Sequence, residues 1–266
     1  MVADRNRKKT FAGDLDWFCD KLTNHQPFAF ARYSDGELYI LQNKKLVLDC
    51  EVIQIDQTTT SGHYKSQDHK FFDPDTIQHA MMRQQLLQAF THRQFNYYKG
   101  ISCRCCVGDQ AFNQQLELHG GDDLSLTWAN LFVNSNYPRF IQQVVPILQT
   151  YPTIMVCHKD ARLDNLGFVD KDFRVGYNAM INDQHVIAEI AEWIQSNNIN
   201  NCLFLFSAST FSNLAIYRLF RDYPNNTYLD IGTCLTPYMD MPADRSYLQE
   251  YWLNQPGSDL KKVCIW

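Results

Sequence analysis

An apolar run leads directly into two carboxylates in the segment Phe28-Ala29-Phe30-Ala31-Arg32-Tyr33-Ser34-Asp35-Gly36-Glu37. An amphipathic stretch, residues 38–41, follows at once. This order predicts a strand that turns into a helix, with both carboxylates at the turn. Ligands of α/β proteins bind at this end of a strand. We therefore expect the turn to be part of a binding site.

The two carboxylates allow two interpretations. As hard oxygen donors next to Arg32, Asp35 and Glu37 would hold Mg²⁺ or Mn²⁺ against a diphosphate, because such ions take one or two protein carboxylates plus substrate phosphates. Ser34 and Glu37 also fit a capping box, in which the two residues exchange hydrogen bonds at a helix start. Capping would occupy the Glu37 side chain that a metal needs, and the tetrapeptide alone favours neither interpretation.

Residues 151–240 have the most regular pattern in the chain. Short β-like runs alternate there with helical apolar stripes, such as those over 186–194 and 214–220. The β-like runs cover residues 153–158, 173–175, 203–206 and 228–231. Alternating strands and helices predict a parallel sheet with right-handed crossovers. We therefore predict an α/β fold with a Rossmann-like, mostly parallel sheet and flanking helices.

The first half of the chain is less regular. Its patterns predict strands over residues 28–32, 46–55 and 101–107 and a polar loop over 58–72. They predict helices through Leu15 and Leu22, over 73–90 and over 137–148. Pro146 is expected to end or kink the last of these helices. No linker or repeat separates the halves. We therefore predict a single domain over residues 1–266, with a weak internal boundary near residue 150.

Composition narrows the functional classes. The 266 residues carry a formal net charge of −5, which argues against nucleic-acid binding because such binding uses a basic surface. No apolar run reaches the roughly 18–20 residues that span a bilayer, and no apolar signal segment follows the basic start. We therefore expect a cytoplasmic protein with no transmembrane segment and no nucleic-acid partner.

Most of the nine cysteines lie inside apolar runs, where a reduced thiol acts as a small hydrophobe. Disulfides are therefore not expected. Three cysteines are grouped in Cys103-Arg104-Cys105-Cys106, which we interpret as having neither the two-residue gap of a zinc knuckle nor a second matching pair downstream. We predict a strand or turn with thiols there and no structural metal.

A second small-residue turn follows the run 203–206. The residues Ser207-Ala208-Ser209-Thr210 precede a helix that contains Asn213. Small residues let a backbone approach a phosphate, and a helix N-terminus favours negative charge. An ordinary Ser/Thr helix cap is the alternative interpretation. His158 and Lys159 come directly after another predicted strand, where Lys159 would offset diphosphate charge or lie in an exposed turn.

Three segments, in this order, resemble the GT-D-fold glycosyltransferases. They are Arg32-Tyr33-Ser34-Asp35-Gly36-Glu37, then Leu205-Phe206-Ser207-Ala208-Ser209-Thr210 with Leu214-Ala215, and Leu229-Asp230-Ile231-Gly232. That family has an Arg-Phe-Gly-Asp-Gly-Glu-like segment near the N-terminus and a late Asp-Ile-Gly strand. Tyr33 and Ser34 stand where the family has Phe and Gly, while both carboxylates are retained. The resemblance covers roughly residues 28–240 and rests mainly on the two ends of that range.

The resemblance implies transfer of a sugar from a nucleotide-sugar donor, with a UDP-sugar as first choice, to a glycan linked to protein or lipid. It assigns Asp35 and Glu37 to a divalent metal, Mn²⁺ or Mg²⁺, as catalytic residues. Arg32, just upstream, is the third candidate catalytic residue, because it would add positive charge; its alternative role is to pair with a structural carboxylate. The donor-binding residues are then expected to be Ser207, Ala208, Ser209, Thr210, Asn213, His158, Lys159 and Asp230.

The sequence leaves open which residue would act as the catalytic base and which of three functional classes the protein belongs to. If the sugar is transferred with inversion, a base must take the acceptor proton, and the candidates are Asp109, Glu117, Asp122, Asp123 and Asp230. The same metal motif would also serve a metal-dependent phosphohydrolase or nucleotidyltransferase. A non-catalytic protein that binds nucleotides or glycans is the third alternative.

Overall fold

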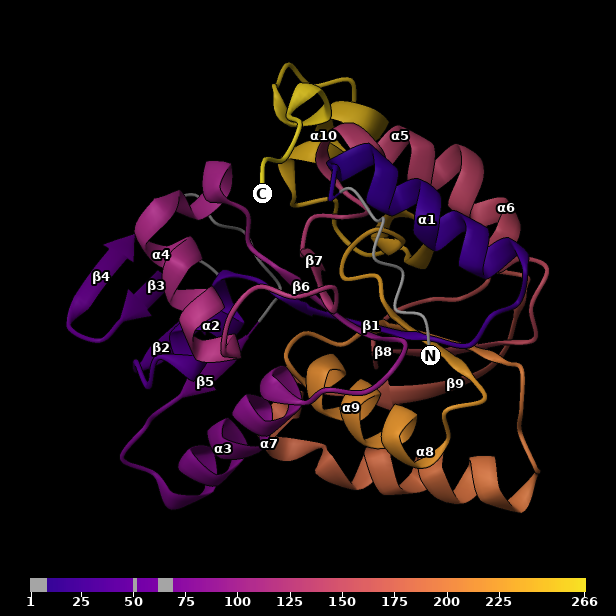
Figure 1. Ribbon diagram of the computed structural model, residues 1–266, viewed down its shortest axis with the longest axis horizontal. Helices are drawn as coiled ribbons and strands as arrows, with labels where there is room; N and C mark the ends of the chain where they lie inside the picture. Colours follow the sequence, from indigo (N-terminus) through magenta and orange to yellow (C-terminus); the bar gives the residue numbers. More distant parts are fainter. Residues whose placement is uncertain (1–8, 50–51, 62–68) are drawn as a thin grey trace.

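The computed structural model describes residues 9–49, 52–61 and 69–266. Its centre is a seven-stranded sheet in the order β7-β6-β1-β11-β10-β8-β9, in which every neighbouring pair is parallel (Figure 1). The strands are β1 (Ala29–Tyr33), β6 (Tyr97–Ile101), β7 (Leu126–Trp128), β8 (Thr153–His158), β9 (Val169–Val175), β10 (Leu203–Ser207) and β11 (Thr227–Asp230). The predicted α/β fold with a mostly parallel sheet is confirmed.

Alternating side chains bury both faces of this sheet. Ala29 and Ala31 of β1 belong to one core, whereas Phe30 belongs to the other, and Phe204 and Leu205 of β10 divide in the same way. Successive side chains of a strand point to opposite faces, so apolar residues at every position require cover on both sides. The sequence has uninterrupted apolar runs because these strands are buried on both faces.

Helices cover the two faces in separate layers. Figure 1 shows α1, α5 and α6 on one face and α3, α7, α8 and α9 on the other. The helices are α1 (Phe11–Thr23), α2 (Asp35–Leu41), α3 (Ile77–Thr91), α4 (Arg104–His119), α5 (Tyr137–Arg139), α6 (Val145–Leu148), α7 (Ala179–Asn182), α8 (Gln184–Ser196), α9 (Phe211–Asp222) and α10 (Ser246–Trp252). A π-helical turn, Phe140–Val144, joins α5 to α6 just before Pro146, which confirms an irregularity at this proline.

A small antiparallel sheet is inserted after α2. Its strands, in the order β4-β3-β2-β5, are β2 (Leu46–Asp49), β3 (Val52–Ile55), β4 (Thr58–Ser61) and β5 (Lys70–Phe72). The expected single run over 46–55 is therefore wrong, because β2 and β3 form an antiparallel pair. The expected loop over 58–72 is wrong at both of its ends, and residues 62–68 lie outside the described part of the chain.

Asn178 fixes the small sheet to the main one. Its side chain accepts a hydrogen bond from the Phe71 amide at 3.3 Å and donates one to the Phe71 carbonyl at 3.0 Å. The Asn178 amide also donates to the His69 carbonyl at 3.1 Å. Strand β5 is thereby held beside the carboxyl edge of the main sheet, where the site is found.

The predicted strand over 101–107 is wrong. Strand β6 ends at Ile101, and Cys103 is the N-cap of α4, so the three grouped cysteines lie at a helix start. Local apolar content suggested a strand, but the parallel pairing of β6 with β1 stops at Tyr33 and Ile101. Within the described residues, no helix has the length and apolar character that crossing a membrane requires.

Candidate functional site

The site lies where the order of the strands in the main sheet reverses. From β1 the chain adds β6 and β7 on one side, and β8 to β11 occupy the other, so β1 and β11 meet at a topological switch point. Ligands of open α/β sheets bind outside the carboxyl ends of such strands. A cavity of about 980 Å³ opens there, lined by the β1–α2 turn, β5, the β10–α9 turn and the segment after β11.

Glu37 joins three parts of this edge. Its carboxylate forms an ion pair with Lys70 at 2.8 Å and accepts a hydrogen bond from the Thr210 hydroxyl at 2.6 Å. It also accepts from the amide and hydroxyl of Ser34, at 3.1 and 3.0 Å. Burial would raise the pKa of Glu37, but Lys70 and the hydroxyl donors lower it from 4.5 to about 2. Both carboxylate oxygens are therefore engaged by the protein, as the capping interpretation anticipated.

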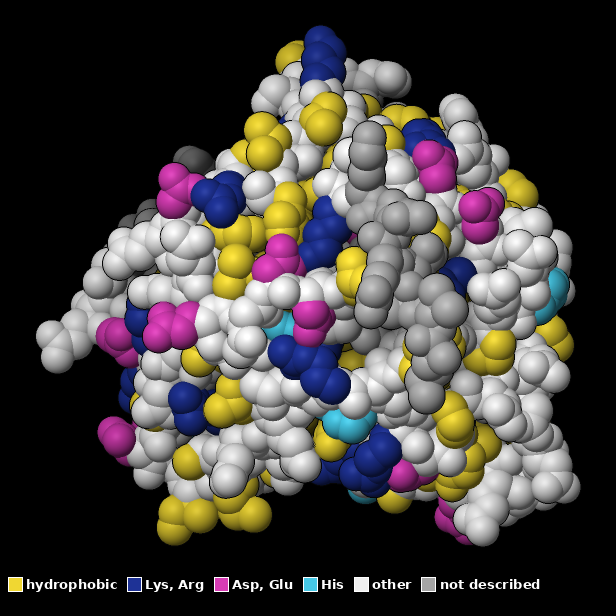
Figure 2. All heavy atoms as spheres, viewed as in Figure 1, with side chains coloured by type: hydrophobic (Ala, Val, Ile, Leu, Met, Phe, Trp, Pro, Cys, Tyr) yellow, Lys and Arg dark blue, Asp and Glu magenta, His cyan; other side chains and the backbone are white. Residues whose placement is uncertain are grey.

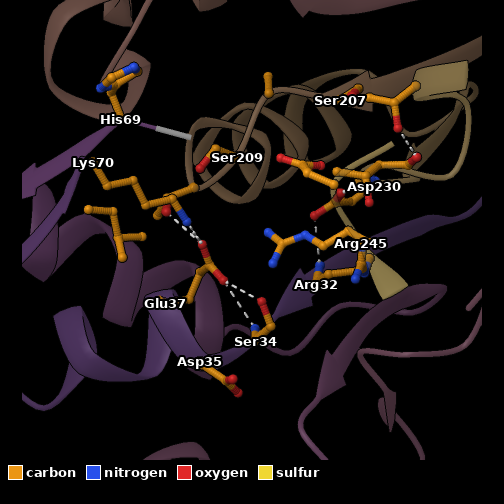
Figure 3. A pocket seen from close by; sticks show the side chains of 18 of the residues that line it. Arg32, Ser34, Asp35, Glu37, His69, Lys70, Ser207, Ser209, Asp230 and Arg245 are labelled. Carbon is orange, nitrogen blue, oxygen red and sulfur yellow. Dashed lines mark hydrogen bonds and ion pairs between the residues drawn. The ribbon is translucent and has the colours of Figure 1, made fainter. Parts of the chain in front are cut away.

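Asp35 has a different environment. It is the first residue of α2 and Glu37 is the third, and residues two apart on a helix do not face each other. Figure 3 shows the Asp35 side chain pointing away from Glu37. Asp35 is exposed, lines the cavity and accepts a hydrogen bond from the Ser102 hydroxyl at 3.2 Å. The two carboxylates of the motif thus reach different parts of the edge.

Arg32 and Asp230 form the centre of the switch point. Asp230 accepts hydrogen bonds from the amides of Arg32, at 3.2 Å, and Gly232, at 3.0 Å. The Arg32 guanidinium donates to the Ala129 carbonyl at 2.6 Å. Burial raises the pKa of Asp230 to about 6, although Arg32 opposes the rise. Asp230 therefore changes its charge near pH 6, above the range of an ordinary aspartate.

Gly232 is required for this arrangement. It has a φ of +51°, and a Cβ atom at this position would lie 1.8 Å from Nη1 of Arg32. A side chain there would displace the guanidinium and strain the backbone. The glycine of the Leu229-Asp230-Ile231-Gly232 segment thus makes room for Arg32.

Basic side chains gather around the cavity. Arg32, Lys70 and Arg245 line it, and Figure 3 shows Arg245 close to Arg32. Figure 2 shows Lys and Arg side chains next to Asp and Glu side chains near the middle of the molecular face. Such a mixed wall suits a ligand with several phosphate oxygens and uncharged hydroxyl groups.

The second predicted turn forms part of the cavity wall, but Asn213 of the following helix does not. Ser207, Ala208, Ser209 and Thr210 line the cavity, and Ser209 has a left-handed φ of +54°. Asn213 is fully buried, and its side-chain amide donates a hydrogen bond to the Arg32 carbonyl at 2.6 Å. It therefore holds the backbone of β1 in place. The turn and Asn213 are brought to the same edge, but Asn213 is not part of the wall.

His158 and Lys159 diverge at the end of β8. His158 lines the cavity, its ring centre lies 4.7 Å from that of Tyr177, and burial lowers its pKa. Lys159 is exposed and is not among the residues that line the cavity, and its Nζ lies 5.7 Å from the Tyr177 ring centre. The structure therefore brings His158, but not Lys159, to the site.

Of the five candidate bases, Asp230 is the one that lines the cavity. The exposed side chains of Asp109 and Asp122 pair with Arg104 and with Lys9. Asp123 pairs with Arg93, and Glu117 is exposed on α4.

Sequence patterns did not identify Lys70, Arg245 or Ser102 as site residues. Lys70 comes from the stretch that was predicted to be a loop, and Arg245 precedes the short helix α10. Ser102 follows the last residue of β6, at the carboxyl end of a strand, but the strand predicted over 101–107 placed this residue inside a strand and hid that signal. The other two reach the site through tertiary contacts that no local pattern shows.

Two solved structures are similar to this fold. One is described as a selenomethionine-substituted structure of domain of unknown function 1792; it has 11% identity and a TM-score of 0.55, and the match covers 86% of this chain and 78% of that chain. The other is described with the statement that this highly conserved domain has a distinct glycosyltransferase fold; it has 12% identity, a TM-score of 0.54 and the same coverage. No protein-family model and no curated protein matches the chain. At this level of identity, the likeness shows that the chain shares the fold.

Proposed function

We propose that the protein is a glycosyltransferase that moves a sugar from a nucleotide-sugar donor to a glycan acceptor. The observation that carries the proposal is the cavity at the switch point, whose wall includes Arg32, Lys70 and Arg245. Lys70 is paired with Glu37, whereas Arg32, Arg245 and the turn at residues 207–210 suit the negative charge of a nucleoside diphosphate. The glycosyltransferase fold of a similar solved structure supports the same class of reaction.

A divalent ion, Mn²⁺ or Mg²⁺, is assigned to Asp35. The side chain is exposed in the cavity, and these ions bind through one or two carboxylates together with substrate phosphates, so a single aspartate is sufficient. Glu37 becomes a second ligand only by releasing Lys70. When bound, the ion neutralises charge on the diphosphate leaving group.

The protein's own residues would perform the remaining tasks. Arg32 and Arg245 hold and orient the diphosphate, and Asp230 accepts the proton of the acceptor hydroxyl. A pKa of about 6 suits a base, because Asp230 is then ionised at neutral pH and still takes up a proton readily. Transfer should therefore rise with pH through about pH 6.

The acceptor is proposed to be a glycan on a protein or lipid, and a UDP-sugar is the first donor to test. We place the reaction in the cytoplasm, because the eight cysteines within the described residues are free thiols, as in a reducing compartment.

A donor-consumption assay tests the function. Nucleotide-sugars are incubated with Mn²⁺, with and without a panel of glycan acceptors, and the released nucleotide is measured. Acceptor-dependent release is expected, with a loss of about 10²- to 10⁴-fold in Asp230→Asn. The matched surface variant Asp109→Asn should retain full activity.

Other outcomes would favour the alternatives. Metal-dependent release at the same rate without an acceptor would indicate a phosphohydrolase or nucleotidyltransferase. Binding of nucleotide with no release under any condition would indicate a non-catalytic binding protein. Either result would overturn the proposal.

A further inference from the structure

Four cysteines converge at the start of α4, and we call them the cysteine cluster. Cys103 is the N-cap of α4, Cys105 and Cys106 lie in the first turn of that helix, and Cys264 comes from the C-terminal segment. All four sulfur atoms lie within 4.8 Å of one another. The sulfurs of Cys103 and Cys105 lie 3.2 Å apart.

This convergence overturns the reason for predicting no structural metal here. Cys103 and Cys106 are separated by two residues, as in a zinc knuckle, and Cys105 lies between them. No second pair is needed, because Cys105 and the distant Cys264 complete a set of four thiols.

The backbone of the turn presents three thiols together. The amides of Cys106 and Val107 donate to the Cys103 carbonyl at 2.9 and 3.1 Å, which closes a tight turn. Gly108, with a φ of +80°, separates this turn from the rest of α4. The left-handed conformation favours glycine and allows the first turn to differ in direction from the helix that follows.

The surroundings of the sulfurs suit thiolates. The side-chain amide of Asn130 donates to Cys106 at 3.4 Å, and that of Asn134 donates to Cys264 at 3.4 Å. The positive charge of Lys262 interacts electrostatically with Cys106. Donors to ligating atoms and a nearby positive charge are what a metal thiolate centre requires of its surroundings.

We propose that the cysteine cluster binds one Zn²⁺ through four thiolates. Zn–S bonds of about 2.3 Å in a tetrahedron place the sulfurs about 3.8 Å apart, so small side-chain movements within the observed cluster suffice. Thiolates select zinc over the oxygen-preferring Mg²⁺ and Mn²⁺. The four thiols lose their protons on binding, and no oxidant or reductant takes part.

The zinc would stabilise one wall of the cavity. It joins the C-terminal segment to the β6–α4 turn, and both Cys106 and Lys262 line the cavity. Ser102, directly before the cluster, hydrogen-bonds to Asp35, and its backbone is held by the Gln115 side chain at 2.9 and 3.1 Å. This zinc is structural and distinct from the ion assigned to Asp35, so its presence does not depend on the proposed transfer reaction.

Metal analysis of the purified full chain is the test. After gel filtration into metal-free buffer, elemental analysis should find about one zinc ion per chain in the wild type. Cys106→Ser and Cys264→Ser should each retain less than about one fifth of it. Cys19→Ser, which changes a half-buried thiol of α1, and Asp35→Asn should retain all of it.

Circular dichroism checks that each variant is folded. Cys106 is exposed, so its replacement should leave the fold intact even if Cys264→Ser does not. Wild type in which Co²⁺ replaces zinc should also show the visible absorption of a tetrahedral cobalt thiolate. Full zinc content in a folded Cys106→Ser variant, a disulfide among these cysteines, or a wild type that holds no zinc even after zinc addition would overturn the proposal.

Discussion

The carboxylates of the β1–α2 turn and the thiols of the cysteine cluster are arranged in opposite ways. Asp35 and Glu37 are separated by one residue, yet their side chains reach different parts of the sheet edge. Cys103 and Cys264 lie in distant parts of the chain, yet their sulfurs lie within 4.8 Å. The direction that the backbone gives each side chain, and not spacing along the chain, decides which groups form a common site.

The comparison also separates two functions within one motif. Glu37 is buried, and four protein donors engage its carboxylate, so we assign it to positioning. Asp35 is exposed in the cavity, so we assign it to ligand binding. Variants of the two residues should therefore affect different measurements.

The largest expected effect is on stability, in Glu37→Gln. Removing one partner of a buried ion pair should lower the free energy of unfolding by about 3–5 kcal/mol, because the ion pair between Glu37 and Lys70 is lost. Urea denaturation followed by circular dichroism measures this loss. The double variant Glu37→Gln, Lys70→Met should recover part of it, and a single-variant loss below about 0.5 kcal/mol would contradict the positioning role.

The next effect is on activity, in Asp35→Asn. This exposed residue should change the free energy of unfolding by less than about 0.5 kcal/mol. Metal-dependent transfer should fall on the order of 100-fold, since a ligand of the ion is lost. Steady-state kinetics across a series of Mn²⁺ concentrations measures this fall. If Asp35→Asn kept wild-type activity at every Mn²⁺ concentration, the assignment of Asp35 to ligand binding would be contradicted.

Acid should remove the contribution of the Glu37 charge to the free energy of unfolding. Its pKa is lowered in the folded state from 4.5 to about 2, so its ionisation stabilises the fold above pH 4.5. The contribution declines as the pH falls from 4.5 and is lost at about pH 2. Urea denaturation over this range should show the difference between wild type and Glu37→Gln shrinking steadily, whereas a constant difference would show that the charge of Glu37 is not responsible.

The smallest effect is expected where the two regions meet, at Ser102. Ser102→Ala removes the hydroxyl that donates to Asp35 but keeps the backbone contacts with Gln115. One hydrogen bond to a charged group contributes about 1.5–3 kcal/mol when buried, and less at this exposed carboxylate, so roughly a fivefold loss of transfer is expected. The zinc content of this variant should equal that of wild type, and loss of zinc would show that the two regions are not separate.

The sequence allowed the parallel sheet to be predicted but only part of the site. The apolar runs of β8, β10 and β11 identify strands buried on both faces, and the small residues after β1 and β10 identify the sheet edge. The antiparallel sheet was missed because its short strands β4 and β5 come from a polar stretch. Lys70, Arg245 and Cys264 reach their sites through contacts between distant segments, which local patterns do not encode.

The cavity is proposed to bind a nucleoside diphosphate through an ion held by Asp35. Calorimetric titration of UDP into the wild type and Asp35→Asn, in Mn²⁺ and in EDTA, tests this binding. We predict that binding requires Mn²⁺ and is lost in Asp35→Asn. Equal binding of UDP by both proteins, or equal binding in Mn²⁺ and in EDTA, would contradict the claim.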